Sequence, residues 1–184
     1  MPNFLKSLVK ISVLSSVVVA PILLSPEQAS AKLRKGTNAS YVGAGISAGV
    51  TNGGKVSDAG DAATFGGNLS GRVKLGNLPV SARGQVLWSD DTTAIIPQVS
   101  VDVPIARGTN AYVGVGYSFV EKDGKATPLG NKDALAVTAG VESEIGRNFL
   151  IYSNATLGVD AYKDNSASAV LVLMAGSAIA LNNG

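Results

Sequence analysis

The sequence predicts an all-β chain that closes into an up-and-down, eight-stranded antiparallel transmembrane β-barrel. Three observations predict it: successive runs in which apolar and polar side chains alternate, short turns that alternate with longer polar loops, and an apolar N-terminal segment ordered like an export signal. A two-residue alternation is typical of strands with two different faces, because successive side chains of a strand point in opposite directions.

Residues 1–31 have the parts of a secretory signal peptide. After two lysines comes an uncharged apolar run, Ile11–Leu24. This run is too short to cross a membrane comfortably, since a spanning helix needs about 20 apolar residues. An Ala-Ser-Ala sequence then predicts cleavage between Ala31 and Lys32. We therefore expect export, followed by one barrel domain over residues 32–184.

Composition argues against an enzyme. The chain of 184 residues contains no histidine and no cysteine. It therefore lacks the commonest general base, the commonest neutral metal ligand and any disulfide framework. Lys and Arg total 15 against 13 for Asp and Glu, without a basic stripe. We expect no catalytic residues, no cofactor, no metal and no nucleic-acid partner.

Seven runs show the alternation clearly. In residues 68–75, for example, Leu69 and Val73 fall on one face while Ser70 and Arg72 fall on the other. An eighth run is apolar on both faces, so its register cannot be determined from the sequence. Most of these runs have a length close to that of a tilted membrane strand, which needs about 9–11 residues. The expected strands are 41–50, 68–75, 80–88, 98–105, 112–119, 135–144, 149–160 and 169–181.

The connections between these runs are of two kinds. Glycine and asparagine mark the tight ones, because both residues tolerate the positive φ angles of turns. Short turns at one end and longer polar loops at the other are typical of outer-membrane barrels, and an even strand count puts both termini on the short-turn, periplasmic side. The tight connections are 35–38, 75–79, 107–110 and 146–148, and the others are 51–64, 89–93, 121–133 and 163–166.

A soluble sandwich and a membrane barrel give the same alternation, so other features have to separate them. Charged residues make up only 15% of the chain, against about 25% in a typical soluble domain. The polar faces carry glycines and isolated charges rather than a dense coat of Lys and Glu. Trp88, Tyr117 and Phe119 fall toward the loop ends of their strands, where an aromatic girdle is expected. These features favour the membrane barrel and leave a soluble periplasmic β-domain as the alternative.

In architecture, residues 39–181 resemble the small outer-membrane barrels of the OmpA-domain, OmpX and opacity-protein type. The resemblance implies a monomer in the cell outer membrane after signal-dependent export. It implies membrane lipid and the β-barrel assembly machinery as partners. The outer-membrane hydrolases and acyltransferases of this architecture rely on histidine, which the sequence lacks, so we expect no such activity.

An eight-stranded barrel is just wide enough for side chains to fill its interior. Counted from the short turns, Arg72, Arg83, Asp102 and Glu142 lie at one depth on polar faces. Buried charges need partners, so we expect an ion-pair network among these four residues. Lumen-facing glycines are expected to make room for the arginines: Gly43, Gly45, Gly114 and Gly116.

Three functions are compatible with this pattern. The first is a non-enzymatic barrel with a structural, surface-interaction or envelope-integrity role, in which the ion pairs only pack the lumen. The second is a narrow porin-like channel for ions or small solutes, in which the pairs exchange partners. The third is a soluble periplasmic β-domain that binds a small ligand.

Overall fold

A computed structural model of the chain describes residues 36–50, 65–90, 92–122, 124–146, 148–162 and 169–181. The chain divides into two compact units, and the second, Lys35–Gly184, contains all of these residues. The expected cleavage between Ala31 and Lys32 lies outside the described residues. Within the described ranges there is no helix that is long and apolar enough to cross a membrane.

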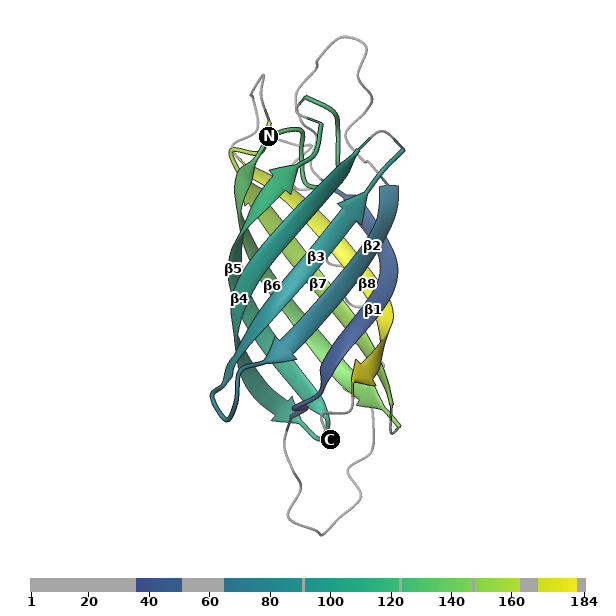
Figure 1. Cartoon of the computed structure of the whole chain (residues 1–184), viewed down its shortest axis with the longest axis vertical. Helices are drawn as coiled ribbons and strands as arrows, with labels where there is room; N and C mark the ends of the chain where they lie inside the picture. The colour runs from purple at the N-terminus through teal and green to yellow at the C-terminus, as the bar shows by residue number, and fades with distance from the viewer. Residues whose placement is uncertain are drawn as a thin grey trace, which may run out of the picture. The chain divides into compact units, whose positions relative to one another are not determined.

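Eight antiparallel strands close into one barrel, as Figure 1 shows. Each strand pairs with its neighbours in the chain, and β1 pairs with β8. Closure leaves no strand edge unpaired, and the prediction of an up-and-down eight-stranded barrel is confirmed. The strands are β1 (Ser40–Gly49), β2 (Phe65–Lys74), β3 (Val80–Trp88), β4 (Thr93–Ala106), β5 (Thr109–Val120), β6 (Ala134–Ile145), β7 (Phe149–Val159) and β8 (Ala169–Leu181).

The two ends of the barrel differ in their connections. Three tight connections join β2 to β3, β4 to β5 and β6 to β7 at one end, which we call the turn side. Gly76, Gly108 and Gly146 lie in them with positive φ angles of 59°, 66° and 80°, as the sequence predicts for tight turns. The β3–β4 and β5–β6 connections lie at the opposite end, which we call the loop side.

Several strands are longer than the alternation predicts, including β5, which begins at Thr109 instead of residue 112. β2 begins at Phe65 instead of residue 68, and β4 begins at Thr93 instead of residue 98. In the sequence, the alternation of β4 begins only after Pro97, because a proline usually interrupts a strand. In the structure Pro97 is exposed on the outer face and pairs with β3, while the paired positions with β5 are interrupted there. A proline has no N–H to donate, so the strand continues at the cost of one interrupted stretch of ladder.

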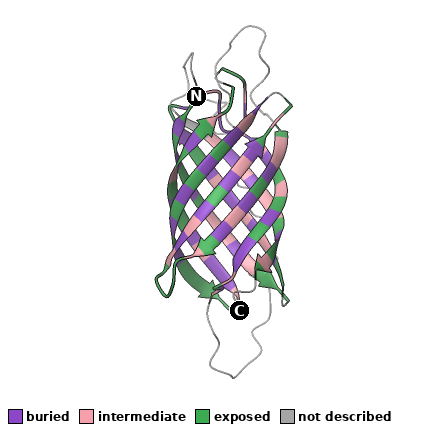
Figure 2. Cartoon of the chain, viewed as in Figure 1, coloured by how far each residue is buried: buried purple, intermediate pink, exposed green. Residues whose placement is uncertain are grey.

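Buried and exposed positions alternate along the strands (Figure 2), and the residues at them are distributed in the reverse of a soluble protein. Along the strands the exposed positions are mostly large apolar residues, such as Ile95, Val101 and Val113. The buried positions facing the lumen include many polar ones, such as Arg72 and Glu142. The register of β8, which the sequence leaves open, follows the same rule where its side chains are described: Val172, Met174 and Ala178 point inward, and Ile179 points outward.

Candidate functional site

Four charged side chains form a closed network in the turn-side half of the lumen. Arg72 lies 2.8 Å from Asp102 and 2.6 Å from Glu142. Arg83 lies 2.8 Å from Asp102 and 2.9 Å from Glu142. Each arginine therefore contacts both carboxylates, and none of the four residues is more than 6% exposed. The structure brings together the four residues that the sequence places at one depth.

The strand register explains why two carboxylates are needed. Arg72 of β2 is the direct partner of Arg83 of β3, and like charges opposite each other destabilise a sheet. Asp102 reaches the pair from β4 and Glu142 reaches it from β6, across the lumen. Two positive and two negative charges then cancel, which matters because an unpaired buried charge costs several kcal/mol, on the order of 3–5 when one partner is removed.

Serine hydroxyls orient the arginines. The Nε of Arg72 donates to the hydroxyl of Ser81 over 2.9 Å, and the Nε of Arg83 donates to the hydroxyl of Ser100 over 2.7 Å. Both serines in turn donate to Asp102, Ser81 to Oδ2 and Ser100 to Oδ1. These bonds use donors and acceptors that the ion pairs alone leave unsatisfied, which reduces the desolvation cost of the buried charges.

The second carboxylate has its own set of partners. The hydroxyl of Tyr41 donates to Glu142 Oε2 over 3.0 Å, and the amide of Asn110 donates to Oε1 over 3.1 Å. The guanidinium of Arg83 lies 3.6 Å from the centre of the Tyr112 ring, a cation–π contact. Sequence reasoning assigned no role to these residues, although Tyr41 and Tyr112 fall on polar faces and Asn110 reads as a turn residue.

A short segment before β1, residues 36–39, crosses the turn-side mouth, and we call it the strap. The amide of Gly36 donates to Ala106 O over 2.8 Å. Thr37 and Asn110 exchange two bonds, since Thr37 N donates to Asn110 Oδ1 and Asn110 Nδ2 donates to Thr37 O. β1 and β5 lie opposite each other in the closed order of strands. The strap therefore spans the mouth from one wall to the other.

The strap is also joined to the charge network. Arg72 donates to the carbonyl oxygens of Thr37 and Ala39, over 3.4 and 3.3 Å. The hydroxyl of Thr37 donates to Glu144, and Thr37 itself is buried. The network is thus covered on the turn side by backbone that it binds directly. The sequence predicts only a tight connection here, because nothing local indicates that it crosses the lumen.

An apolar cluster lies in the loop-side half of the lumen, beside buried serine and threonine side chains. Its buried side chains come from β3, β4, β6 and β8, which are spread around the barrel, and from two loop segments. A cluster drawn from so many walls fills the cross-section. Its members are Leu87, Ala94, Ile96, Leu129, Ala134, Ala136, Ala161, Val172 and Met174.

A buried turn of the β5–β6 loop, residues 127–130, closes this end, and we call it the loop plug. A Cβ at Gly49 of β1 would lie 2.7 Å from Pro128 O, and one at Gly158 of β7 would lie 3.2 Å from the Leu129 side chain. The loop plug therefore reaches walls far from its own strands. The prediction of a polar loop over 121–133 misses this, since one leucine among polar neighbours gives no sign of burial.

The sequence analysis expected the lumen glycines to make room for the arginines, and this expectation is wrong. Cβ atoms at Gly43, Gly45 and Gly116 would first meet backbone or Cβ atoms of the neighbouring strand, and one at Gly114 would first meet Gln98. Other glycines accommodate aromatic rings instead. A Cβ at Gly140 would lie 2.6 Å from the Tyr112 ring, and one at Gly176 would lie 2.4 Å from the Tyr152 hydroxyl.

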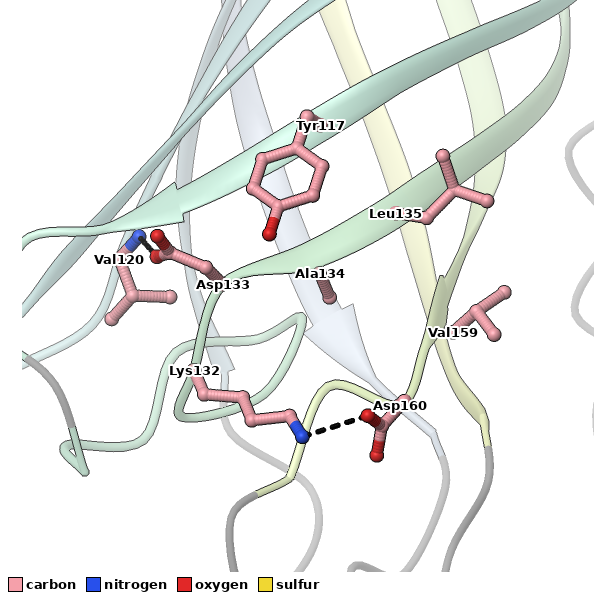
Figure 3. A pocket seen from close by; sticks show the side chains of 8 residues that line it. All are labelled: Tyr117, Val120, Lys132, Asp133, Ala134, Leu135, Val159 and Asp160. Atoms are coloured by element: carbon pink, nitrogen blue, oxygen red, sulfur yellow. Dashed lines mark hydrogen bonds and ion pairs between the residues drawn. The ribbon is translucent and has the colours of Figure 1, made fainter.

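A hollow on the outer wall lies near the loop side, between β5, β6 and β7 (Figure 3). Tyr117 and Leu135 line it together with an ion pair in which Lys132 lies 2.8 Å from Asp160. The hollow is separate from the lumen network. Among the described residues, no group of three or more His, Cys, Asp or Glu side chains could hold a metal ion.

The chain is similar to the crystal structure of Neisserial surface protein A (NspA), with a TM-score of 0.54 and 16% identity over 77% of this chain and 97% of that one. It is also similar to Ail, the attachment invasion locus protein of Yersinia pestis, with a TM-score of 0.49 and 15% identity over 78% and 99% of the two chains.

A scan against protein-family models and a search of curated proteins found no match. At 16% sequence identity, the similarity to NspA shows the fold alone. The resemblance that the sequence suggests is confirmed at that level: the chain has the closed eight-stranded barrel fold of the small outer-membrane proteins.

Proposed function

We propose that the chain is a non-enzymatic, monomeric barrel of the cell outer membrane that supports the envelope or presents its loops at the surface. The observation that carries the proposal is the reversed distribution of side chains, apolar outside and charged inside. A membrane barrel has this distribution because its outer face contacts lipid and its inner face is polar. Membrane lipid and the β-barrel assembly machinery are its proposed partners.

The outer face of β4 and β5 gives the clearest support. Val99 pairs with Val115, and Val101 pairs with Val113, so the four side chains are contiguous. Each is more than half exposed. A soluble monomer rarely exposes such a continuous apolar surface, whereas lipid covers it at no cost. This argues against the soluble periplasmic domain that the sequence leaves open.

Aromatic residues support a membrane boundary near the loop side. Trp88 ends β3, and Tyr117 and Phe119 lie near the end of β5, all with exposed side chains. Tyr117 also lines the hollow of Figure 3, beside charged Lys132. Aromatic rings next to polar groups are typical of the membrane–water interface.

The filled lumen favours a packing role for the charge network. The strap crosses one mouth and the loop plug crosses the other. Between them, Arg72 and Arg83 are each held by both carboxylates. A channel would have to displace these segments and break several buried ion pairs, so we do not propose conduction. The absence of histidine and cysteine from the sequence supports a non-enzymatic role.

The test is a matched pair of arginine substitutions. Val115 lies in the middle of β5, and Leu78 lies in the β2–β3 turn, and both are exposed. If lipid covers the barrel wall, Val115→Arg costs about 2–4 kcal/mol and lowers the folded fraction in vesicles, while Leu78→Arg costs about 0–1. Equal and small effects of the two substitutions on stability would contradict the membrane location.

Fractionation and gel mobility extend the test to the native protein. We expect the unboiled chain to come from the outer-membrane fraction and to migrate differently from the boiled chain. Recovery in the soluble periplasm would contradict the proposal. Conductance steps from the pure protein in a planar bilayer would restore the channel as the better function.

A further inference from the structure

Three buried amide side chains lie between the charge network and the apolar cluster: Gln85, Gln98 and Asn154. They are 3%, 5% and 4% exposed. Four of their polar atoms have no hydrogen-bond partner among the described residues, namely Gln85 Oε1, both amide atoms of Gln98 and Asn154 Oδ1, while the amide nitrogen of Asn154 bonds to the Tyr112 hydroxyl. Orphaned polar atoms are rare in protein interiors, so this concentration calls for a physical explanation.

Two of the three amides lie next to a hydrogen bond that crosses the lumen. The hydroxyl of Tyr152 in β7 donates to Asn68 Oδ1 in β2 over 2.6 Å. Ser70 donates to the same oxygen over 3.3 Å, and Gln85 is the register partner of Ser70. Asn154 lies two positions beyond Tyr152 on the same face of β7. Gln85 and Asn154 therefore flank this bond from two walls.

Neighbours in the strand register place the amides between the two halves of the lumen. Gln98 pairs with Arg83 of the charge network, and Asn154 pairs with Met174 of the apolar cluster. Gln98 Oε1 lies over Gly114 of β5, since a Cβ there would come within 2.9 Å of it. We call the three amides the amide belt. It lies inside the barrel, covered by the charge network and the strap at one end and by the apolar cluster and the loop plug at the other.

The chemistry of the amide belt defines what can bind there. Its unpartnered oxygens accept hydrogen bonds and its unpartnered nitrogen donates them, and the group carries no charge. A ligand must therefore be small, neutral and able both to donate and to accept. Leaving these atoms without water would cost stability, whereas one water molecule makes about two to four hydrogen bonds to such groups. We propose that Gln85, Gln98 and Asn154 bind a small cluster of internal water molecules.

The first test looks for this water directly. In the refolded barrel, we expect the side-chain amide protons of Gln98 and Asn154 to show rotating-frame Overhauser cross-peaks to water with the sign of a long-lived complex. Asn110 is the internal control, because its amide nitrogen donates to Thr37 O and to Glu142. The absence of these cross-peaks at Gln98 and Asn154, or equal ones at Asn110, would overturn the proposal.

The second test separates a wet belt from a dry one. Gln98→Met keeps the length of the side chain and removes its polar atoms. If the belt is dry, this variant removes two orphaned atoms and raises the urea midpoint of unfolding. If water is bound, the variant removes partners of that water, and we expect the midpoint to fall. An unchanged or higher midpoint counts against the proposal. Neither result bears on the membrane location, which the arginine pair at Val115 and Leu78 tests separately.

Discussion

The two halves of the lumen are organised around different groups, a network of charges in one and an apolar cluster in the other. On the turn side, Arg72 and Arg83 form ion pairs with Asp102 and Glu142. On the loop side, apolar side chains around Leu129 pack together. The same narrow eight-stranded cross-section is filled in both cases, because such a barrel has room for side chains and little else. The comparison shows that the wall sets the volume of the interior, while the chemistry can differ from one end to the other.

The segments that close the two mouths differ in the same way. The strap is held by directional hydrogen bonds, such as those between Thr37 and Asn110. The loop plug is held by the packing of Leu129 and by the close approach of Pro128 to Gly49. Hydrogen bonds and ion pairs require specific partners, whereas apolar packing requires mainly the right volume. We therefore expect the turn side to be the more sensitive half to conservative substitution.

The largest effect is expected from Glu142→Gln, which keeps the shape of the side chain and removes its charge. Arg72 and Arg83 then share one carboxylate, and the interior holds an uncompensated positive charge. Breaking a buried pair in this way costs about 3–5 kcal/mol, measured as the free energy of unfolding in urea with lipid vesicles. The exposed Glu121→Gln is the control and should change little.

A double substitution sharpens this prediction. Adding Arg72→Met to Glu142→Gln leaves Arg83 against Asp102, so the charges balance again. Part of the lost stability should return, because replacing a buried pair by residues of similar volume is far cheaper than breaking it. Additive losses from the two substitutions would show that the ion pairs do not act as one network.

On the loop side, Leu129→Ala is the corresponding test. The side chain is 1% exposed and lies in the apolar cluster. Its truncation should cost about 2–3 kcal/mol, at the lower part of the range for buried leucines, because the loop plug can relax toward the cavity. Leu129→Met, which keeps the volume, should be nearly neutral by the same urea measurement. If Leu129→Met were as damaging as Glu142→Gln, the contrast between the two halves would be wrong.

The strap is tested by two glycines with the same backbone angle. Gly36 and Gly146 both have a φ of 80°. A Cβ at Gly36 would lie 2.4 Å from Asn110 Oδ1 and 2.7 Å from Pro104, whereas nothing lies within 4 Å of one at Gly146. Gly146→Ala should cost about 1 kcal/mol from left-handed strain alone, and Gly36→Ala should cost about 1 kcal/mol more.

Equal losses for the two alanine variants would show that the strap does not pack against β4 and β5 in solution. A complementary readout is limited proteolysis at residues 36–39. The strap should become a cleavage site in Gly36→Ala and stay protected in Gly146→Ala, because only the first substitution displaces backbone that is now hydrogen-bonded.

The sequence allowed the barrel and its four buried charges to be predicted, because both depend on local rules. Alternation gives the face of each residue, and counting from the turns gives its depth. The register of β8 could not be predicted, and the structure gives the reason. Val172 and Met174 face an apolar stretch of lumen, so this strand is apolar toward the inside as well as toward the outside. Alternation fails where both environments are alike.

The closing segments could not be predicted for another reason. The burial of Thr37 and Leu129 depends on contacts with walls on the far side of the barrel. Such contacts leave no local pattern in a short polar connection. The glycines expected to face arginines instead lie against the neighbouring strand, and the rings of Tyr112 and Tyr152 lie over two other glycines, Gly140 and Gly176.

The smallest effect is expected at the ion pair outside the lumen, where solvent surrounds the charges, whereas those of the turn-side network are buried. Lys132 lies 2.8 Å from Asp160, as Figure 3 shows, but the Asp160 side chain is 67% exposed. Asp160 has a positive φ of 56°, which asparagine also tolerates, so Asp160→Asn removes the charge without straining the backbone. We expect a loss of about 0.2–1 kcal/mol, shrinking further in 1 M salt. The loss from Glu142→Gln should hardly respond to salt, because water and ions do not reach the buried network. A strong salt response at Glu142 would therefore indicate that the turn-side mouth is open to solvent and that the strap does not close it.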